Sequence, residues 1–427
     1  MGSRAEQLCP SMRGPSPATQ QQDYELYYAI FFDGTGNNML NTDDIIAAST
    51  VESMRALLAR GDSYGNDYSN VAKLYRLKRN SPAEELRIER KLYLDGIGTS
   101  RNGSDSTYGF ATGRGDYGME ARCLQALNRV RGEARTISRG ADCRAITLYL
   151  DLFGFSRGAA AARHFVHLIL EADLTELKVE QKNIRFVGLY DSVAAEGAMH
   201  SNDVDDLHLN RLGVAEKVVQ YAAADEFRSK FELVDINSAV SAGVGTQHYL
   251  PGAHSDVGGG YAQNLRETRM KLRDETLFNF SASEDSYNDQ RHLERMGYYR
   301  SDEWLAMEDG RELYVTRANP IDHLYARVPL YLMVDEINGM SYDFLGFSQG
   351  RYSISENRLL MGVKSALRAK MDGGPIPLSE WSQDQPLGTL RLAQLRRTYC
   401  HFSSRYDAVG LSPRFVGNAR IREIYNG

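Results

Sequence analysis

The chain has 427 residues, of which 42% are hydrophobic and 25% are charged, so it can bury the core of a globular protein. Its formal net charge is −6, and Lys and Arg are dispersed among Asp and Glu, which argues against a nucleic-acid partner. No apolar run approaches the roughly 18 residues that cross a bilayer, so we expect no more than peripheral contact with a membrane.

At the start of the chain, residues 1–22 are rich in Pro, Ser and Gln and are predicted to be a disordered lead-in. They lack the apolar middle of a signal peptide, so we expect synthesis in the cytoplasm and export by another route. The four cysteines form no CxxC pair and have no histidine at metal-ligand spacing, so no zinc site and no cofactor is predicted. They are Cys9, Cys123, Cys143 and Cys400.

Apolar runs rich in β-branched and aromatic residues then alternate with helix-like segments. The predicted strands are 27–32, 91–94, 145–153, 184–190 and 245–250, and the predicted helices are 71–78, 118–137, 159–170 and 214–224. This alternation predicts an α/β fold, with a mostly parallel central sheet flanked by helices. In such sheets ligands bind beyond the carboxyl ends of the strands.

The expected catalytic core covers 23–264, and the more polar region 265–427 is expected to add helices and loops packed on that core. Within the core, 39–68 is an inserted helical segment in which Ala47, Val51, Met54 and Leu58 recur at helical spacing. This helix could be a lid or a lipid-contacting surface. Packing on the core is the favoured alternative.

A candidate nucleophile lies in the sequence GFSRG, residues 154–158, which matches the G-x-S-x-G pattern of serine hydrolases. The pattern alone is weak, but here it follows the apolar run ITLYLDLF and precedes a helix that begins with four alanines. A second match at 346–350 lacks that strand and helix. We therefore predict Ser156 as the nucleophile, with a purely structural tight turn as the alternative.

A serine hydroxyl needs a base, and the base needs an orienting carboxylate. Asp191 directly follows the predicted strand IRFVGLY, and His254 lies in the glycine-rich loop PGAHSDVGGGY. In this fold the order along the chain is serine, acid, histidine. We predict His254 as the base and favour Asp191 as the acid over Asp256, which could instead shape the loop.

Acyl transfer also needs N–H donors for the developing oxyanion. The N–H of Arg157 is one candidate, and Gly34 or Thr35, in the loop after the first strand, could supply the other. Asp33 is predicted to anchor this loop, although an ordinary glycine-rich turn remains the alternative. Farther along the chain, Asp203, Asp205 and Asp206 could hold calcium, but a solvated loop is favoured.

Six sequence blocks, in this order, resemble the catalytic domain of type VI secretion phospholipase effectors, the Tle-one-like family. They are FFDGTGNN, SNVAKLY, YLDGIGT, GFSRGAAAAR, LYDSVA and PGAHSDVGGGY. The resemblance covers residues 27 to about 262 and implies an α/β-hydrolase fold. It also places the family's nucleophile, acid and base on Ser156, Asp191 and His254.

The resemblance implies an antibacterial lipase that cleaves acyl esters of glycerophospholipids. It further implies delivery to the periplasm of a rival cell on a secretion spike protein, and an immunity protein that guards the producer. Two alternatives stay open: an esterase or thioesterase that acts on soluble acyl esters, and a binding protein that keeps the fold without catalysis.

Overall fold

The structure is a computed structural model that describes residues 21–79, 84, 86–193, 203–274, 282–305, 312–338, 350–408 and 410–427. Three predictions lie outside these ranges: most of the lead-in 1–22, Cys9, and the serine of the second G-x-S-x-G match.

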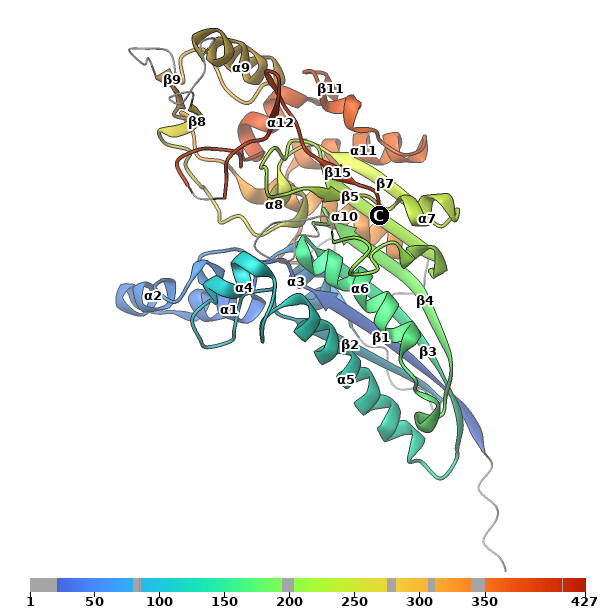
Figure 1. Cartoon of the computed structure of the whole chain (residues 1–427). Coiled ribbons are helices and arrows are strands. Elements are labelled where there is room, and N and C mark those ends of the chain that lie inside the picture. Colours follow the sequence, from blue (N-terminus) through green and yellow to red (C-terminus); the bar gives the residue numbers. More distant parts are fainter. Residues whose placement is uncertain are drawn as a thin grey trace, which may run out of the picture.

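In the described part of the chain, six strands form one parallel sheet in the order β2-β1-β3-β4-β5-β7 (Figure 1). The strands are β1 (Gln22–Phe32), β2 (Arg87–Leu94), β3 (Cys143–Phe155), β4 (Val179–Tyr190), β5 (Lys217–Ala223) and β7 (Gly245–Leu250). All five predicted strands are present. The predicted parallel α/β architecture is therefore confirmed.

Alternation along β1 shows how the sheet buries both faces. Leu26, Ile30 and Phe32 point into one hydrophobic cluster, whereas Ala29 and Phe31 point into the other. Helices α5 (Met119–Ser138) and α6 (Arg157–Glu171) cover the first face, as Figure 1 shows. Helices α3 (Asn70–Leu77) and α10 (Arg327–Asn338) cover the second.

The rest of the second cluster comes from the C-terminal region, whose buried side chains pack in continuity with those of the sheet. Its helices are α9 (Ala282–Met296), α11 (Arg358–Asp372) and α12 (Leu392–Tyr399). Its short strands are β8 (Met270–Asp274), β9 (Trp304–Leu305), β10 (Glu312–Val315), β11 (Pro386–Leu387), β12 (Leu390–Arg391), β13 (Phe415–Val416), β14 (Ala419–Arg420) and β15 (Ile424–Tyr425). β8 to β10 form an antiparallel sheet, and β15 pairs with β6 (Leu233–Val234).

The predicted helix 214–224 is wrong, because these residues contain strand β5. From Val218 to Ala223 every side chain is buried, since β5 lies inside the sheet between β4 and β7. A short apolar run that is buried on both sides has no period-2 pattern, and periodicity alone does not distinguish it from a buried helix.

The inserted segment forms two helices, α1 (Met39–Ala47) and α2 (Val51–Leu58), rather than one. Thr50 caps α2 through a reciprocal pair of bonds with Ser53, which ends the continuity with α1. No side chain of α2 is buried, and Val51 is 66% exposed. The favoured packing of this helix on the core is therefore wrong.

Within the described ranges, no helix combines the length and apolarity needed to cross a membrane.

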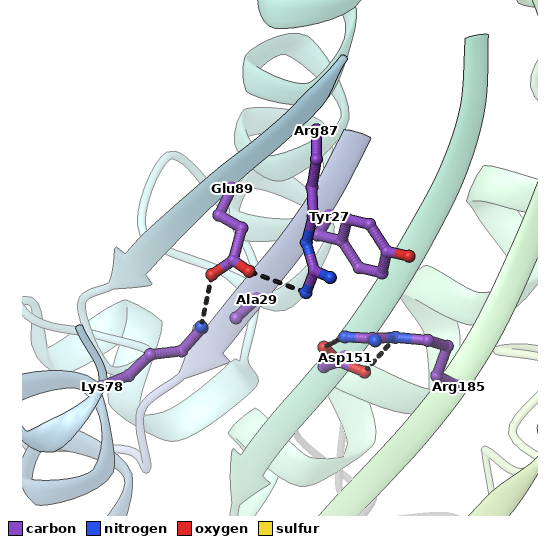
Figure 2. Close-up of a pocket in the computed structure, with 7 residues that line it drawn as sticks. All are labelled: Tyr27, Ala29, Lys78, Arg87, Glu89, Asp151 and Arg185. Carbon is purple, nitrogen blue, oxygen red and sulfur yellow. Dashed lines mark hydrogen bonds and ion pairs between the residues drawn. The ribbon is translucent and has the colours of Figure 1, made fainter. Parts of the chain in front are cut away.

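A cluster of charged side chains lies on one face of the sheet, close to Tyr27 (Figure 2). Arg185 donates to both carboxylate oxygens of Asp151, and Glu89 pairs with Lys78 and Arg87. Asp151 is 1% exposed, and burial raises its pKa to about 6 although Arg185 opposes the shift. The ion pair therefore compensates a charge that is costly to bury.

Replacement of Arg185 tests this cluster. We expect Arg185→Ala to lower the free energy of unfolding by about 3 kcal/mol at pH 7, because Asp151 would stay buried and unpaired. The loss should shrink at pH 5: Asp151 has a raised pKa in the folded state, so it takes up a proton there and its charge disappears. Urea unfolding at both pH values measures the effect.

The control is Arg144→Ala, which breaks the exposed pair with Asp23 and should change the free energy of unfolding little. An equal loss of stability in the two variants would contradict this interpretation.

Candidate active site

Ser156 occupies a strained turn between β3 and α6. Its φ is 59° and its ψ is −130°. Residues other than glycine rarely adopt this backbone conformation, which is typical of a nucleophile elbow. The flanking glycines are required by close backbone contacts. A Cβ on Gly154 would lie 2.4 Å from the Cα of Ala159, and one on Gly158 would lie 2.3 Å from the carbonyl oxygen of Asp33. The turn thus forms only with these small residues.

Because the strand order is β2-β1-β3, the topological switch point of the sheet lies between β1 and β3, and ligands of open α/β sheets bind at such points. The loop after β1 and the serine turn after β3 meet there. Gly158 packs on Asp33, and Nε of Arg157 donates to Oγ1 of Thr35 at 2.8 Å. The chain thus brings the predicted nucleophile beside the predicted oxyanion loop.

Asp191 follows β4 directly and is fully buried. Its Oδ1 accepts from the N–H of Ala223 at 2.7 Å and from Nη1 of Arg422 at 2.6 Å. Its Oδ2 accepts from Nη2 of Arg422 at 2.9 Å and also contacts Nδ1 of His254. Burial alone would raise the pKa of Asp191, but Arg422 and His254 outweigh it and hold that pKa well below its usual range. Asp191 is therefore an anion throughout the physiological range.

His254 is the first residue of a short helix, α8 (His254–Gly258), in the segment where the sequence predicted a loop. Its backbone N–H donates to Glu226 at 3.3 Å. Its ring packs between Phe155, with centroids 4.6 Å apart, and Phe231, at 5.0 Å. The pKa of His254 is lowered, because burial outweighs the opposing effect of Asp191. A neutral imidazole with Nδ1 held by a carboxylate is the form that a general base requires.

The described side chains show no hydrogen bond between the hydroxyl of Ser156 and His254. The two residues are nevertheless neighbours, since the ring of His254 packs on Phe155, the residue before Ser156. The main chain of Ser156 also bonds to both ends of the Asp191 turn: its N–H donates to Tyr190 at 3.0 Å, and its carbonyl accepts from Val193 at 3.3 Å. Nucleophile–base hydrogen bonds often tighten only when substrate is bound.

Among the oxyanion candidates, the N–H of Gly34 already donates to Oδ1 of Asp33 at 2.7 Å. In the described contacts, the N–H of Thr35 has no such acceptor. Asp33 is buried, its Oδ2 accepts from Tyr93 at 2.5 Å, and burial raises its pKa to about 6. Asp33 thus holds the loop in place, and its contact with the N–H of Gly34 leaves the N–H of Thr35 as the candidate second donor.

Asp256 lies away from the imidazole of His254. Its Oδ1 contacts Nδ1 of His401 at 2.7 Å, and its Oδ2 accepts from the N–H groups of Ala253 and His401, both at 2.9 Å. These contacts fasten the segment that carries His254 to the C-terminal region. The contacts therefore pair Asp191 with His254, whereas Asp256 shapes the segment that carries His254.

Three residues around the site escaped the sequence analysis. Arg422 binds Asp191, and Glu226 and Arg228 form a buried ion pair beside His254. Arg228 also stacks 3.3 Å above the ring of Phe231, which itself packs on His254. Nothing in the sequence around them signals a site, because each acts through a partner that is distant in the chain or through packing.

As for metals, no three His, Cys, Asp or Glu side chains of the described ranges are grouped so that they could hold an ion. The described acidic residues at 203–206 belong to a turn in which Asp205 accepts from Asn210 at 3.5 Å.

Comparison with known proteins identifies related domains. Residues 170–279 match the family described as "T6SS, Phospholipase effector Tle1-like, catalytic domain", a range that contains Asp191 and His254. No curated protein matches the chain. The solved structure of the Tle1 effector bound to the VgrG spike of the type 6 secretion system superposes with a TM-score of 0.64 at 20% identity, over 96% of this chain and 95% of that one.

An uncharacterized protein from Pseudomonas aeruginosa superposes less well, with a TM-score of 0.46 at 19% identity, over 86% of this chain and 53% of that one. The sequence match over 170–279 and the shared fold confirm the resemblance to the Tle1-like catalytic domain of type VI secretion phospholipase effectors.

Proposed function

We propose that the chain is a serine-dependent phospholipase of the A type, in which Ser156 is the nucleophile, His254 the general base and Asp191 the orienting acid. One observation carries the proposal: the buried carboxylate of Asp191 contacts Nδ1 of His254, whose ring packs on Phe155, the residue before a serine in a strained strand-to-helix turn. This combination is costly to build and is typical of acyl transfer.

In the proposed reaction, Nε2 of His254 takes the proton of the Ser156 hydroxyl as that oxygen attacks the ester carbonyl. Asp191 stabilises the imidazolium that forms, because it already accepts from Nδ1. The N–H groups of Arg157 and Thr35 stabilise the oxyanion. The imidazolium then gives its proton to the departing alcohol, and a water molecule releases the acyl group from Ser156 by the same steps.

The proposed substrate is the ester-linked acyl chain of a membrane glycerophospholipid, which the description of the matching family supports. The proposed setting is antibacterial: delivery to the periplasm of a target cell by type VI secretion, with a cognate immunity protein in the producer. A spike protein is the proposed carrier, since the structurally similar Tle1 effector was solved with the VgrG spike.

The first test of this function is lipid hydrolysis. We expect the wild-type protein to release free fatty acid from phospholipid vesicles and Ser156→Ala to release none, with mass spectrometry of the products on defined lipids as the measurement. A short soluble ester serves as the comparison substrate. Undiminished release by Ser156→Ala would refute the serine mechanism, whereas hydrolysis of the soluble ester alone would favour an esterase.

A second test separates the two aspartates. Asp191→Asn should lower kcat on the soluble ester by a factor of roughly 10⁴, because the amide no longer fixes the imidazole in the productive form. Asp256→Asn should keep most of the activity, since its contacts are with His401 and Ala253. Labelling of Ser156 by a fluorophosphonate probe needs no substrate, and it should be much slower in Asp191→Asn than in Asp256→Asn. Equal losses in both variants would contradict the assignment of the acid.

The pH dependence is a third test. The pKa of His254 is lowered from its usual 6.5, so its imidazole stays neutral to a lower pH than an ordinary histidine. The rate should therefore fall on acidification with a midpoint below 6.5, where protonation removes the base. A profile of kcat/KM between pH 4 and pH 8 on the soluble ester measures this midpoint, and a midpoint above 6.5 would be the contrary result.

A further inference from the structure

The segment that carries Arg422 crosses the carboxyl edge of the main sheet. Figure 1 shows it in dark red, leading to β15, which pairs with β6. On one side of Arg422, Arg420 forms a fully buried ion pair with Asp289. On the other, Ile424 and Tyr425 of β15 pair with β6. Both flanks are fixed, so the backbone at residue 422 is held in place.

The guanidinium of Arg422 is buried and connects three parts of the site. Nη1 and Nη2 donate to the two carboxylate oxygens of Asp191 as a fork. Nε donates to the carbonyl of Phe231 at 2.7 Å, and Nη1 also reaches the carbonyl of Ala223 at 3.3 Å. A bidentate fork fixes the plane of the carboxylate as well as its position.

We propose that Arg422 is a positioning residue for the reaction: it holds the Asp191 carboxylate against His254 and, by offsetting the charge of that carboxylate, limits how tightly His254 binds a proton. This inference rests on the proposed function, because it assigns Asp191 and His254 their parts in the triad.

The charges around His254 explain why Arg422 matters. Asp191 favours the imidazolium, Glu226 does so more weakly, and Arg228 opposes it. Glu226 and Arg228 pair with each other at 2.8 Å, so their effects largely offset. Arg422 is then the cation that balances Asp191. Without it, the full charge of the carboxylate would act on the imidazole, and the pKa of His254 would rise.

The direct test measures the proton affinity of His254 by NMR titration of its ring nitrogens, in the Ser156→Ala protein so that no turnover is needed. With Arg422→Gln, which removes the charge but keeps an N–H donor, we expect the pKa of His254 to rise by about one unit. With Arg422→Lys, which keeps the charge, the pKa should stay close to that of the parent. The matched control is Arg420→Gln, which loosens the same segment but does not touch Asp191.

Kinetics on the soluble ester provide the second readout. Arg422→Gln should move the acid limb of kcat/KM to higher pH by the same amount. Arg422→Lys should leave the limb in place and lower kcat with KM unchanged, because a single ammonium does not reproduce the fork. Thermal unfolding establishes that each variant is folded. If Arg422→Gln does not fold, the kcat of Arg422→Lys tests the proposal: a lower kcat with KM unchanged supports it, and an unchanged kcat contradicts it.

Three results would overturn the proposal: an unchanged His254 titration in Arg422→Gln, an equal shift in Arg420→Gln, or an unchanged kcat in Arg422→Lys. The failure of the proposed function looks different. In that case the wild-type protein itself would hydrolyse no ester, while the NMR titration would still report the effect of Arg422 on His254.

Discussion

The buried negative charge of Asp191 is the constraint around which the site is organised. An unpaired carboxylate at this depth would cost several kcal/mol, so the fold tolerates it only with compensating partners. Those partners come from separate places: the N–H of Ala223 at the end of β5, the imidazole of His254 at the start of α8, and the guanidinium of Arg422 far along the chain. One charge thereby ties the sheet to the C-terminal region.

The site also requires that main-chain segments approach each other closely at the carboxyl edge of the main sheet. The turn at Ser156 fits only because Gly158 lets the helix rest on the loop after β1. The loop is in turn held by Asp33, which binds Gly34 and Tyr93. Residues that the sequence spreads over several blocks therefore meet at the switch point of the sheet, and backbone packing sets the spacing between Ser156 and the loop that holds the proposed oxyanion donors.

Local patterns were sufficient to predict most of the sheet, the strand-turn-helix at Ser156 and the contact of Asp191 with His254. They failed for β5, because burial on both faces removes the alternation that marks a strand. They failed also for α2, whose helical spacing of apolar residues predicted packing that the structure does not contain. Arg422 was beyond reach for a different reason: its part depends on a contact with Asp191 across 231 positions, and no local pattern encodes it.

That separation along the chain has a consequence for biosynthesis. A growing polypeptide acquires the serine, the aspartate and the histidine well before the arginine that completes their surroundings. Until the segment around residue 422 emerges from the ribosome and docks against β6, the aspartate lacks its main counter-charge. Any chain that stops short of this segment would hold the aspartate without the guanidinium fork that fixes the plane of its carboxylate.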